Sequence, residues 1–242
     1  MTTLDGAVVL ITGANGGLGR EFVGQALARG ARTVYASART PREWADPRVV
    51  ALPLDVTDAN SVAAAVAAAG DVTALVNNAG AIGPATLLDA DLAADLTGVR
   101  DLFETNVFGP LAVAAAFAPG LAANGRDGQG AALIDIHSAL AWLARGGAYS
   151  ASKAALWSIT NSLRLELADR GIQVVGVHLG YTDTPMIADL DVHKEDPADV
   201  VRAVYDGLET GAHEVLADDT SRFVKDRLSQ PLTVMYPELA RA

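Results

Sequence analysis

The sequence predicts an α/β fold: a doubly wound parallel sheet of about seven strands with helices on both faces. Short runs rich in Val, Ile and Leu alternate along the chain with longer Ala- and Leu-rich segments, a pattern typical of parallel strands joined by crossover helices. Most of the short runs lack the apolar–polar alternation of a half-buried strand, which indicates that both faces of the sheet are covered. The length of 242 residues favours a single domain over residues 1–242.

The expected strands and helices alternate along most of the chain, except that the second and third strands follow one another directly. The expected strands are Ala7–Thr12, Arg32–Ser37, Val49–Leu52, Ala74–Asn77, Ala131–Ile136, Gln173–His178 and Glu214–Ala217. The expected helices are Gly17–Arg29, Ser61–Ala69, Val99–Asn124, Tyr149–Asp169 and Pro197–Thr210. The last helix has the clearest start signal, because Asp196 can cap it, Pro197 fits its first position and Asp199 suits the positive end of its dipole.

Two irregular stretches interrupt this order. The Gly-rich stretch Asn124–Gly130 is interpreted as a loop that follows a helix. Residues 181–196 contain Pro185 and are too few for a second domain, so we interpret them as a short lid.

Composition excludes several classes of function. The formal charge is −11, and the Lys and Arg side chains are scattered, which argues against a nucleic-acid partner. The chain has no Cys, so disulfides and a Cys nucleophile are excluded, and a cytoplasmic location is the simplest interpretation. No basic leader and no uninterrupted apolar run of about 18 residues is present, so no membrane association is expected. The four His residues are dispersed, which predicts no metal site.

A glycine-rich turn follows the first expected strand and precedes a helix. It reads Thr-Gly-Ala-Asn-Gly-Gly-Leu-Gly over residues 12–19. Gly lets the backbone turn sharply and approach a pyrophosphate, while the helix N-terminus offers unpaired N–H donors. The spacing differs from Gly-x-Gly-x-x-Gly, and a tight loop without a ligand remains the alternative. The expected dinucleotide contacts are Gly13, Asn15, Gly16, Gly17, Leu18 and Gly19.

The ends of the next two strands suggest which dinucleotide binds. The second strand runs into Ser37-Ala38-Arg39, where an acidic residue would accept from a ribose 2′-hydroxyl and where a guanidinium can instead bind a 2′-phosphate. Arg39 thus favours NADP over NAD, with a solvated surface Arg as the alternative. Asp55, beside Val56, can accept from the adenine amino group or cap the following helix.

Polar side chains expected at the carboxyl edge of the sheet could carry the chemistry. Tyr149 and Lys153 are spaced i,i+4 and share a helix face, which brings a cation near a phenol and so offers proton transfer near neutral pH. Ser138 ends the fifth strand and could orient a substrate oxygen, and Asn106 is a polar residue inside a helical pattern. Each feature alone has an ordinary structural explanation.

Taken together, these motifs resemble the short-chain dehydrogenase/reductase family over nearly the whole chain. Residues 12–19 match its cofactor turn, Asp55 its adenine contact and Asn77–Gly80 its strand-four motif. The resemblance implies a Rossmann-like fold, NADP(H), hydride transfer and a homodimer or homotetramer. It implies a catalytic tetrad of Asn106, Ser138, Tyr149 and Lys153. It also implies cofactor contacts from Ser37, Val56, Asn78, Ala79, Gly80, Tyr149, Lys153, Gly180, Thr182 and Thr184.

The sequence departs from the family pattern in a few places. Ser138 and Tyr149 are 11 positions apart, about two fewer than in the family, so the loop Leu140–Gly147 is trimmed. Leu179 stands where Pro is usual, and Gly16 where many NADP-using members have a basic residue. His137 replaces a more usual Ser, and strand alternation points it away from Ser138, which favours a packing role over a proton relay.

The expected activity is reversible, NADPH-dependent reduction of a ketone or aldehyde to an alcohol. In it Tyr149 protonates the carbonyl oxygen, Ser138 binds that oxygen, Lys153 holds the ribose and lowers the Tyr149 pKa, and Asn106 supports a water for reprotonation. An NAD-linked alcohol dehydrogenase and a non-catalytic NADP(H)-binding sensor remain the alternatives. The residues that could line an apolar substrate pocket, or merely pack the lid, are Trp142, Leu143, Tyr181, Met186 and Ile187.

Overall fold

One parallel sheet organises the protein. The structure is a computed structural model that describes residues 2–88, 95–125 and 130–241. Its seven strands lie in the order β3-β2-β1-β4-β5-β6-β7, and every neighbouring pair is parallel. The strands are β1 Val8–Thr12, β2 Thr33–Ala38, β3 Val49–Pro53, β4 Ala74–Asn77, β5 Ala131–Ile136, β6 Ile172–His178 and β7 Glu214–Leu216. The predicted doubly wound sheet is confirmed, and each strand end lies within one residue of its expected place.

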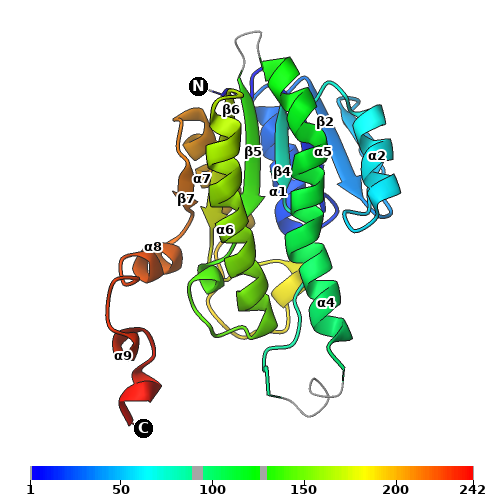
Figure 1. Ribbon diagram of the computed structural model, residues 1–242. Helices are drawn as coiled ribbons and strands as arrows, with labels where there is room; N and C mark the ends of the chain where they lie inside the picture. The colour runs from blue at the N-terminus through cyan, green and yellow to red at the C-terminus, as the bar shows by residue number, and fades with distance from the viewer. Residues whose placement is uncertain (1, 89–94, 126–129, 242) are drawn as a thin grey trace.

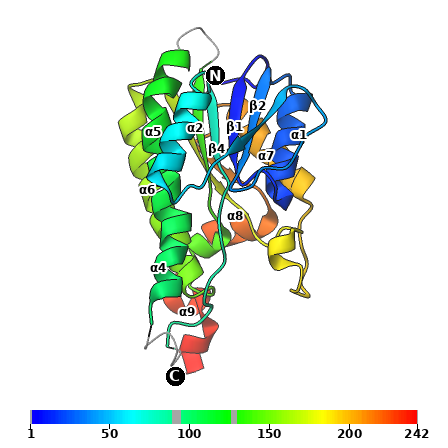
Figure 2. The same ribbon diagram turned by 90° about the vertical axis from the view of Figure 1, so that its right-hand side faces the viewer.

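Helices cover both faces of this sheet, as Figures 1 and 2 show. One face carries α1 (Gly17–Ala28) and α7 (Pro197–Glu209), and the other carries α2 (Ala59–Ala68), α5 (Gly109–Asn124) and α6 (Ala148–Ala168). Each face has its own apolar core, one containing Phe22 and Val204 and the other Phe117 and Leu167. Strands β1 and β5 are buried along their whole length, which explains why their sequences do not alternate.

The longest helical stretch changes its winding in the middle. Instead of one uniform helix over Val99–Asn124, the chain forms α4 (Thr97–Phe103), a π-helical turn η1 (Glu104–Phe108) and then α5. Among the described residues, Thr97–Asn124 is the one stretch long and apolar enough to cross a bilayer, and half of its most apolar window is buried inside the protein. Packing of α5 on the sheet accounts for that apolar character.

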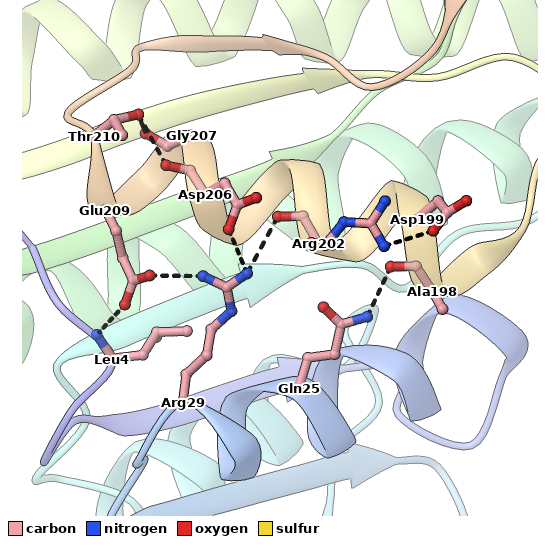
Figure 3. A network of polar contacts seen from close by, with 10 residues as sticks. All are labelled: Leu4, Gln25, Arg29, Ala198, Asp199, Arg202, Asp206, Gly207, Glu209 and Thr210. Carbon is pink, nitrogen blue, oxygen red and sulfur yellow. Dashed lines mark hydrogen bonds and ion pairs between the residues drawn. The ribbon is translucent and has the colours of Figure 1, made fainter.

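Helices α1 and α7 are joined by a polar network on their outer side (Figure 3). Arg29 of α1 donates to Asp206 at 2.5 Å and to Glu209 at 2.6 Å, both on α7. Gln25 donates to the carbonyl of Ala198 at 2.8 Å. The start of α7 matches its sequence signals, since the Asp196 carboxylate accepts from the Ala198 N–H at 2.8 Å.

Several segments gather at the carboxyl edge of the sheet. The stretch 181–196 is closed at its base, because Asp183 N–H donates to the Glu195 carbonyl and Glu195 N–H donates to that of Tyr181. After β7 the chain forms three elements that the sequence analysis did not predict: α8 Asp219–Lys225, α9 Leu232–Met235 and η5 Pro237–Arg241. They extend below this edge in Figures 1 and 2. Of the loop expected at 124–130, residues 126–129 lie outside the described part of the chain.

Candidate active site

The glycine turn is held against the end of β4 by one hydroxyl group. Thr12 Oγ1 accepts from the backbone N–H groups of Asn78 and Ala79 at 3.0 and 2.9 Å, and the Asn78 side chain donates back to the Thr12 carbonyl at 2.8 Å. Gly13 has a φ of 67°, and a Cβ there would lie 3.0 Å from Ala79 Cα. The predicted glycine turn and the strand-four motif therefore meet, and Gly13 is required both for its backbone conformation and for close approach.

The rest of the turn leads into α1. Gly16 occupies the N-cap without a side-chain bond, so the first N–H groups of the helix receive no side-chain cap. A Cβ on Gly19 would lie 2.3 Å from the Gly13 carbonyl oxygen, which fixes glycine at that position. Leu18 packs on the core. Asn15 bonds the loop after β2, with its amide donating to the Thr40 carbonyl at 2.8 Å and its carbonyl accepting from Arg42 N–H at 3.2 Å.

The expected ribose and adenine residues have separate environments. Ser37 is buried and its hydroxyl donates to the Ile11 carbonyl at 3.0 Å, so its side chain is used inside the fold. Arg39 is exposed on the loop that Asn15 holds. Hydrogen bonds from Thr57, followed by the nearby Arg39 charge, lower the pKa of Asp55.

Asp55 does not cap the following helix. Its carboxylate accepts from the N–H and hydroxyl of Thr57 at 3.0 and 2.8 Å, and Asp58 is the N-cap of α2. The capping alternative is therefore wrong. Val56 is buried and lies against Gly109, where a Cβ would be 2.8 Å from Val56 Cγ2.

The segment after β6 returns to the glycine turn. Gly180 N–H donates to the carboxylate of Asp218, the N-cap of α8. A Cβ on Gly17 would lie 2.7 Å from Thr184 Cγ2, so the turn and Thr184 are in contact. Thr182 is buried, and its hydroxyl has no hydrogen-bond partner among the described residues.

Ser138 and Tyr149 meet despite the trimmed loop between them. Ser138 lies at the end of β5, where its Oγ accepts from Leu140 N–H at 3.1 Å and caps the short 3-10 helix η3, Ala139–Ala141. Gly147, with a φ of 52°, precedes α6 and sets Tyr149 in its first turn. The Ser138 hydroxyl donates to the Leu179 carbonyl at 3.5 Å, and it lies close enough to the Tyr149 phenol to lower the pKa of that phenol.

Burial governs the pKa values of the Tyr–Lys pair. It raises the pKa of Tyr149 to about 12, a rise that the nearby Ser138 hydroxyl opposes, and lowers the pKa of Lys153 to about 8. Lys153 Nζ donates to the Ile136 carbonyl at 2.8 Å and lies 5.8 Å from the Tyr149 ring centroid. Without the cofactor, burial is the largest influence on the Tyr149 pKa, and the lowering of this pKa by Lys153 stays a prediction for the cofactor-bound protein.

Asn106 sits in the π-helical turn, fully buried. Its carbonyl accepts from Ala81 N–H at 2.8 Å, and its amide donates to the Ala81 carbonyl at 2.9 Å and to Ser152 Oγ at 3.0 Å. Both amide hydrogens are thus used inside the protein. A Cβ on Gly80 would lie 3.4 Å from Asn106 Oδ1 and 3.6 Å from Lys153 Nζ, so these two groups border the same glycine and all four tetrad residues lie at one edge of the sheet.

The residues expected around the substrate do not form one wall. Trp142 stacks on the buried His178, with ring centroids 3.6 Å apart, and so serves the packing of the loop. Tyr181 and Met186 are exposed. Leu143 borders a hollow of about 280 Å³ between the trimmed loop and the C-terminal segment, where Arg145 pairs with Glu238 at 2.8 Å. Among the described residues no three His, Asp or Glu side chains lie together as metal ligands.

The sequence analysis assigned no individual role to three residues that order the site. Thr12 orders both motifs of the turn, Asp218 holds Gly180, and Asp135 is buried behind the tetrad, where its two carboxyl oxygens are hydrogen-bonded to Asn77 and Thr160. Asp218 begins a capping box with Ser221, and the Asp-x-x-Ser spacing was a usable signal. Asp135 gave a different signal, an acidic residue inside an otherwise apolar strand.

The residues at this edge fit a nicotinamide dinucleotide. The glycine turn, Asn78 to Gly80 and the segment from Gly180 to Thr184 converge from three strand ends. Gly13 and Gly19 bring backbone close to backbone, an uncapped helix begins beside them, and the Thr182 hydroxyl is buried without a partner. An orphaned buried hydroxyl is the kind of group that a bound ligand satisfies.

Fold and site together define a dinucleotide-binding protein with a doubly wound α/β fold. The model of the short chain dehydrogenase family matches residues 7–195. The chain belongs to the short-chain dehydrogenase family.

Similar proteins agree with this assignment. The chain is 37% identical over 192 residues to Short-chain dehydrogenase PC-15 of Penicillium crustosum, a match that spans 73% of this chain and 66% of that protein. A crystal structure of a short chain dehydrogenase from Burkholderia cenocepacia in complex with NADP has a TM-score of 0.90 and 35% identity, covering 98% of this chain and 99% of the other. A 3-ketoacyl-(acyl-carrier-protein) reductase from Brucella melitensis complexed with NADH has a TM-score of 0.75 and 25% identity, covering 85% and 91%.

Proposed function

We propose that the protein is an NADPH-dependent oxidoreductase that reduces a ketone or aldehyde to an alcohol, reversibly, with Tyr149 as the general acid and base. The observation that carries this proposal is the placement of Ser138 at the end of β5, of Tyr149 in the first turn of α6 and of Lys153 against the Ile136 carbonyl, at the sheet edge that also carries the glycine turn. When bound, the reduced nicotinamide supplies a hydride to the carbonyl carbon.

The side chains divide the remaining work. Tyr149 keeps its proton at neutral pH, because burial raises its pKa to about 12, and so it can donate that proton to the carbonyl oxygen. Ser138 donates a hydrogen bond to the same oxygen. Lys153 holds the ribose hydroxyls, and Asn106 fixes residue 81 and Ser152 beside it. Replenishing the Tyr149 proton through a water near Lys153 remains part of the proposal.

The cofactor contacts are proposed from their positions. Backbone N–H groups at Gly17, Leu18 and Gly19 would hold the pyrophosphate at the start of α1, and Gly16, whose N–H donates to the Gly13 carbonyl at 3.2 Å, would let the backbone approach it closely. Asp55 and Val56 would bind the adenine, and Thr182 and Thr184 the carboxamide. Arg39 supports NADP over NAD because it is an exposed cation directly after β2, on the loop that Asn15 holds, and the similar Burkholderia cenocepacia protein was crystallised with NADP.

The substrate side and the assembly are further parts of this proposal. Leu143, Tyr181, Met186 and Ile187 would favour an apolar carbonyl compound, and residues 181–196, closed at their base, would act as the lid of a single domain spanning residues 1–242. We also propose a homodimer or homotetramer formed through α5 and α6, and a cytoplasmic location. No nucleic-acid partner or membrane association is proposed.

The test is the loss of reduced-nicotinamide absorbance when the purified protein receives NADPH or NADH with a panel of ketones, aldehydes and quinones. Turnover with NADPH well above NADH is the expected result. Faster turnover with NADH would instead favour the NAD-linked alcohol dehydrogenase. Tight NADPH binding without turnover of any compound would favour the sensor.

A further inference from the structure

A chain of four buried hydrogen bonds runs behind the catalytic residues. Asp135 Oδ2 and Thr160 Oγ1 are 2.7 Å apart, and Thr160 Oγ1 and His137 Nε2 are 2.9 Å apart. His137 Nδ1 lies 3.2 Å from His178 Nε2, and His178 Nδ1 lies 3.2 Å from the Ser138 carbonyl oxygen. Asp135, His137, Thr160 and His178 are each at most 1% exposed, so no bulk water can complete these contacts.

Counting protons along this chain leads to an imbalance. Four contacts need four hydrogens, whereas an ionised carboxylate, one hydroxyl and two neutral imidazoles supply three. With three, at least one contact sets two lone pairs against each other in the interior. Thr160 Oγ1 also lies 2.9 Å from the Leu156 carbonyl, but a hydroxyl has a single hydrogen to donate, and in the chain it is donated to His137.

Burial decides where the fourth proton belongs. On either histidine it would create a buried imidazolium beside a buried carboxylate, whereas on Asp135 it leaves every member neutral. Burial raises the pKa of Asp135 and lowers the pKa of both histidines. The charged groups that act on the chain are Lys153 and Arg164 from α6, Glu214 from β7 and Lys225 from α8. Of these, Lys153 and Arg164 favour an ionised Asp135 and disfavour a charged His137.

We propose that Asp135 is a neutral carboxylic acid that donates through Thr160 and His137 to His178, and that this chain positions Ser138. In this arrangement every bond points the same way, from Asp135 Oδ2–H to the Ser138 carbonyl. The other carboxyl oxygen, Asp135 Oδ1, accepts from the Asn77 amide at 2.9 Å.

The last bond of the chain reaches the residue that binds the substrate oxygen in the proposed function, on which this part of the inference rests. The Ser138 carbonyl accepts from His178 and from Ala141 N–H at 2.9 Å. Trp142 stacks on the same His178 ring. His178 therefore holds the turn between β5 and η3 by its contact with the Ser138 carbonyl. His137 points away from Ser138 and acts on this turn only through its contact with His178. Asp135, His137 and His178 are therefore positioning residues, because they act on the substrate only through Ser138.

The protonated carboxyl is tested by infrared spectroscopy, which needs no turnover. The wild-type protein is expected to show the C=O stretch of a protonated carboxyl group at pH 8, Asp135→Asn to lose it, and Glu214→Gln to keep it. Since Asn supplies an N–H in place of the acid O–H, Asp135→Asn is also expected to fold with an unchanged far-ultraviolet spectrum. Absence of the band at pH 8, or failure of Asp135→Asn to fold, overturns the proposal.

The positioning of Ser138 is tested by two substitutions of one residue. An Asn side chain carries its nitrogen at the place of Nδ1 and keeps the bond to the Ser138 carbonyl, whereas a Gln side chain carries it at the place of Nε2 and loses that bond. His178→Gln is expected to lower kcat about tenfold with the KM for NADPH unchanged, and His178→Asn to restore most of kcat. His213→Gln, at an exposed position near the other end of β7, is the control. Equal loss in both His178 variants overturns this part of the inference.

Measurements of turnover and of the infrared band distinguish failure of the proposed function from failure of the proposed buried acid. A band at pH 8 in a protein that turns over no carbonyl compound would leave the buried acid standing and remove the proposed function. Turnover without the infrared band would support the proposed function and would exclude a protonated Asp135.

Discussion

Two polar networks in this protein differ in what surrounds them. Between α1 and α7, Arg29 binds Asp206 and Glu209 with side chains that are 21%, 59% and 31% exposed, as Figure 3 shows. Behind the site, Asp135 and Lys153 are almost completely buried. Solvent and salt screen the first network, so each of its ion pairs is worth little. In the second, the position of every proton matters, because an unpaired buried group is expensive.

Of the substitutions that test this difference, the one that removes the Tyr149 hydroxyl in the buried site is expected to have the largest effect on activity. Tyr149→Phe removes the proton donor while keeping the ring, so kcat is expected to fall at least about 100-fold with little change in NADPH affinity. Steady-state kinetics and a fluorescence titration with NADPH check this. Tyr35→Phe is the matched control, since it removes a hydroxyl that bonds the exposed Asp71. Retained turnover in Tyr149→Phe would exclude Tyr149 as the acid.

The next effect concerns cofactor choice. Arg39→Ala should lower kcat/KM for NADPH by about 10- to 100-fold, the loss expected for a charge-assisted bond to a phosphate, and leave NADH unaffected. Arg42 lies on the same loop, with its guanidinium over the ring of Trp44. The control variant Arg42→Ala should keep the wild-type ratio of kcat/KM for NADPH to kcat/KM for NADH. A parallel fall with both cofactors would show that Arg39 supports the loop and not the 2′-phosphate.

Lys153→Met tests whether the buried ammonium group, which the proposed function needs, lowers the stability of the folded protein. Burial lowers the pKa of Lys153 from 10.5 to about 8, so below pH 8 the folded protein carries a disfavoured charge. Between about pH 8 and 10.5 the unfolded chain binds more protons, and wild-type stability rises with pH. Lys153→Met should therefore be inactive yet more stable at pH 7 by about 1–2 kcal/mol.

Guanidinium unfolding at pH 7 and pH 9.5 measures this effect. The advantage of the variant is expected to shrink at the higher pH, as the wild-type ammonium loses its proton. A variant that is less stable than the wild type at pH 7 would contradict the expectation and would give more weight to the lost bond between Lys153 Nζ and the Ile136 carbonyl.

The smallest effect belongs to the exposed network. Arg29→Ala should lower the free energy of unfolding by about 1 kcal/mol, and the difference should narrow in high salt, with activity unchanged. Arg202→Ala removes the more exposed pair with Asp199 and should change stability less. A larger loss that resists salt would assign the role of Arg29 to its contact with the ring of Tyr205, not to its ion pairs.

Sequence reasoning reached the sheet because its signals are local. Buried parallel strands read as short apolar runs, and Gly13 to Gly19 lie together in the chain, so both could be predicted. The pKa of Tyr149 could not, since it depends on how completely the folded protein removes water from the phenol. The same holds for Ser37, whose hydroxyl finds a partner on β1, and for the short elements α9 and η5, whose place depends on contacts with the loop before Tyr149.

The π-helical turn at Glu104–Phe108 acts as a phase shift between two helices. It holds one residue more per turn than regular winding would, so a deletion of one residue there would restore a uniform α-helix. That deletion would also rotate α4 by about 100° relative to α5, and either Asn106 or the apolar stripe of α5 would face the wrong way. The extra residue in the π-helical turn thus lets one continuous helical stretch pack α5 against the sheet and also direct Asn106 toward the site.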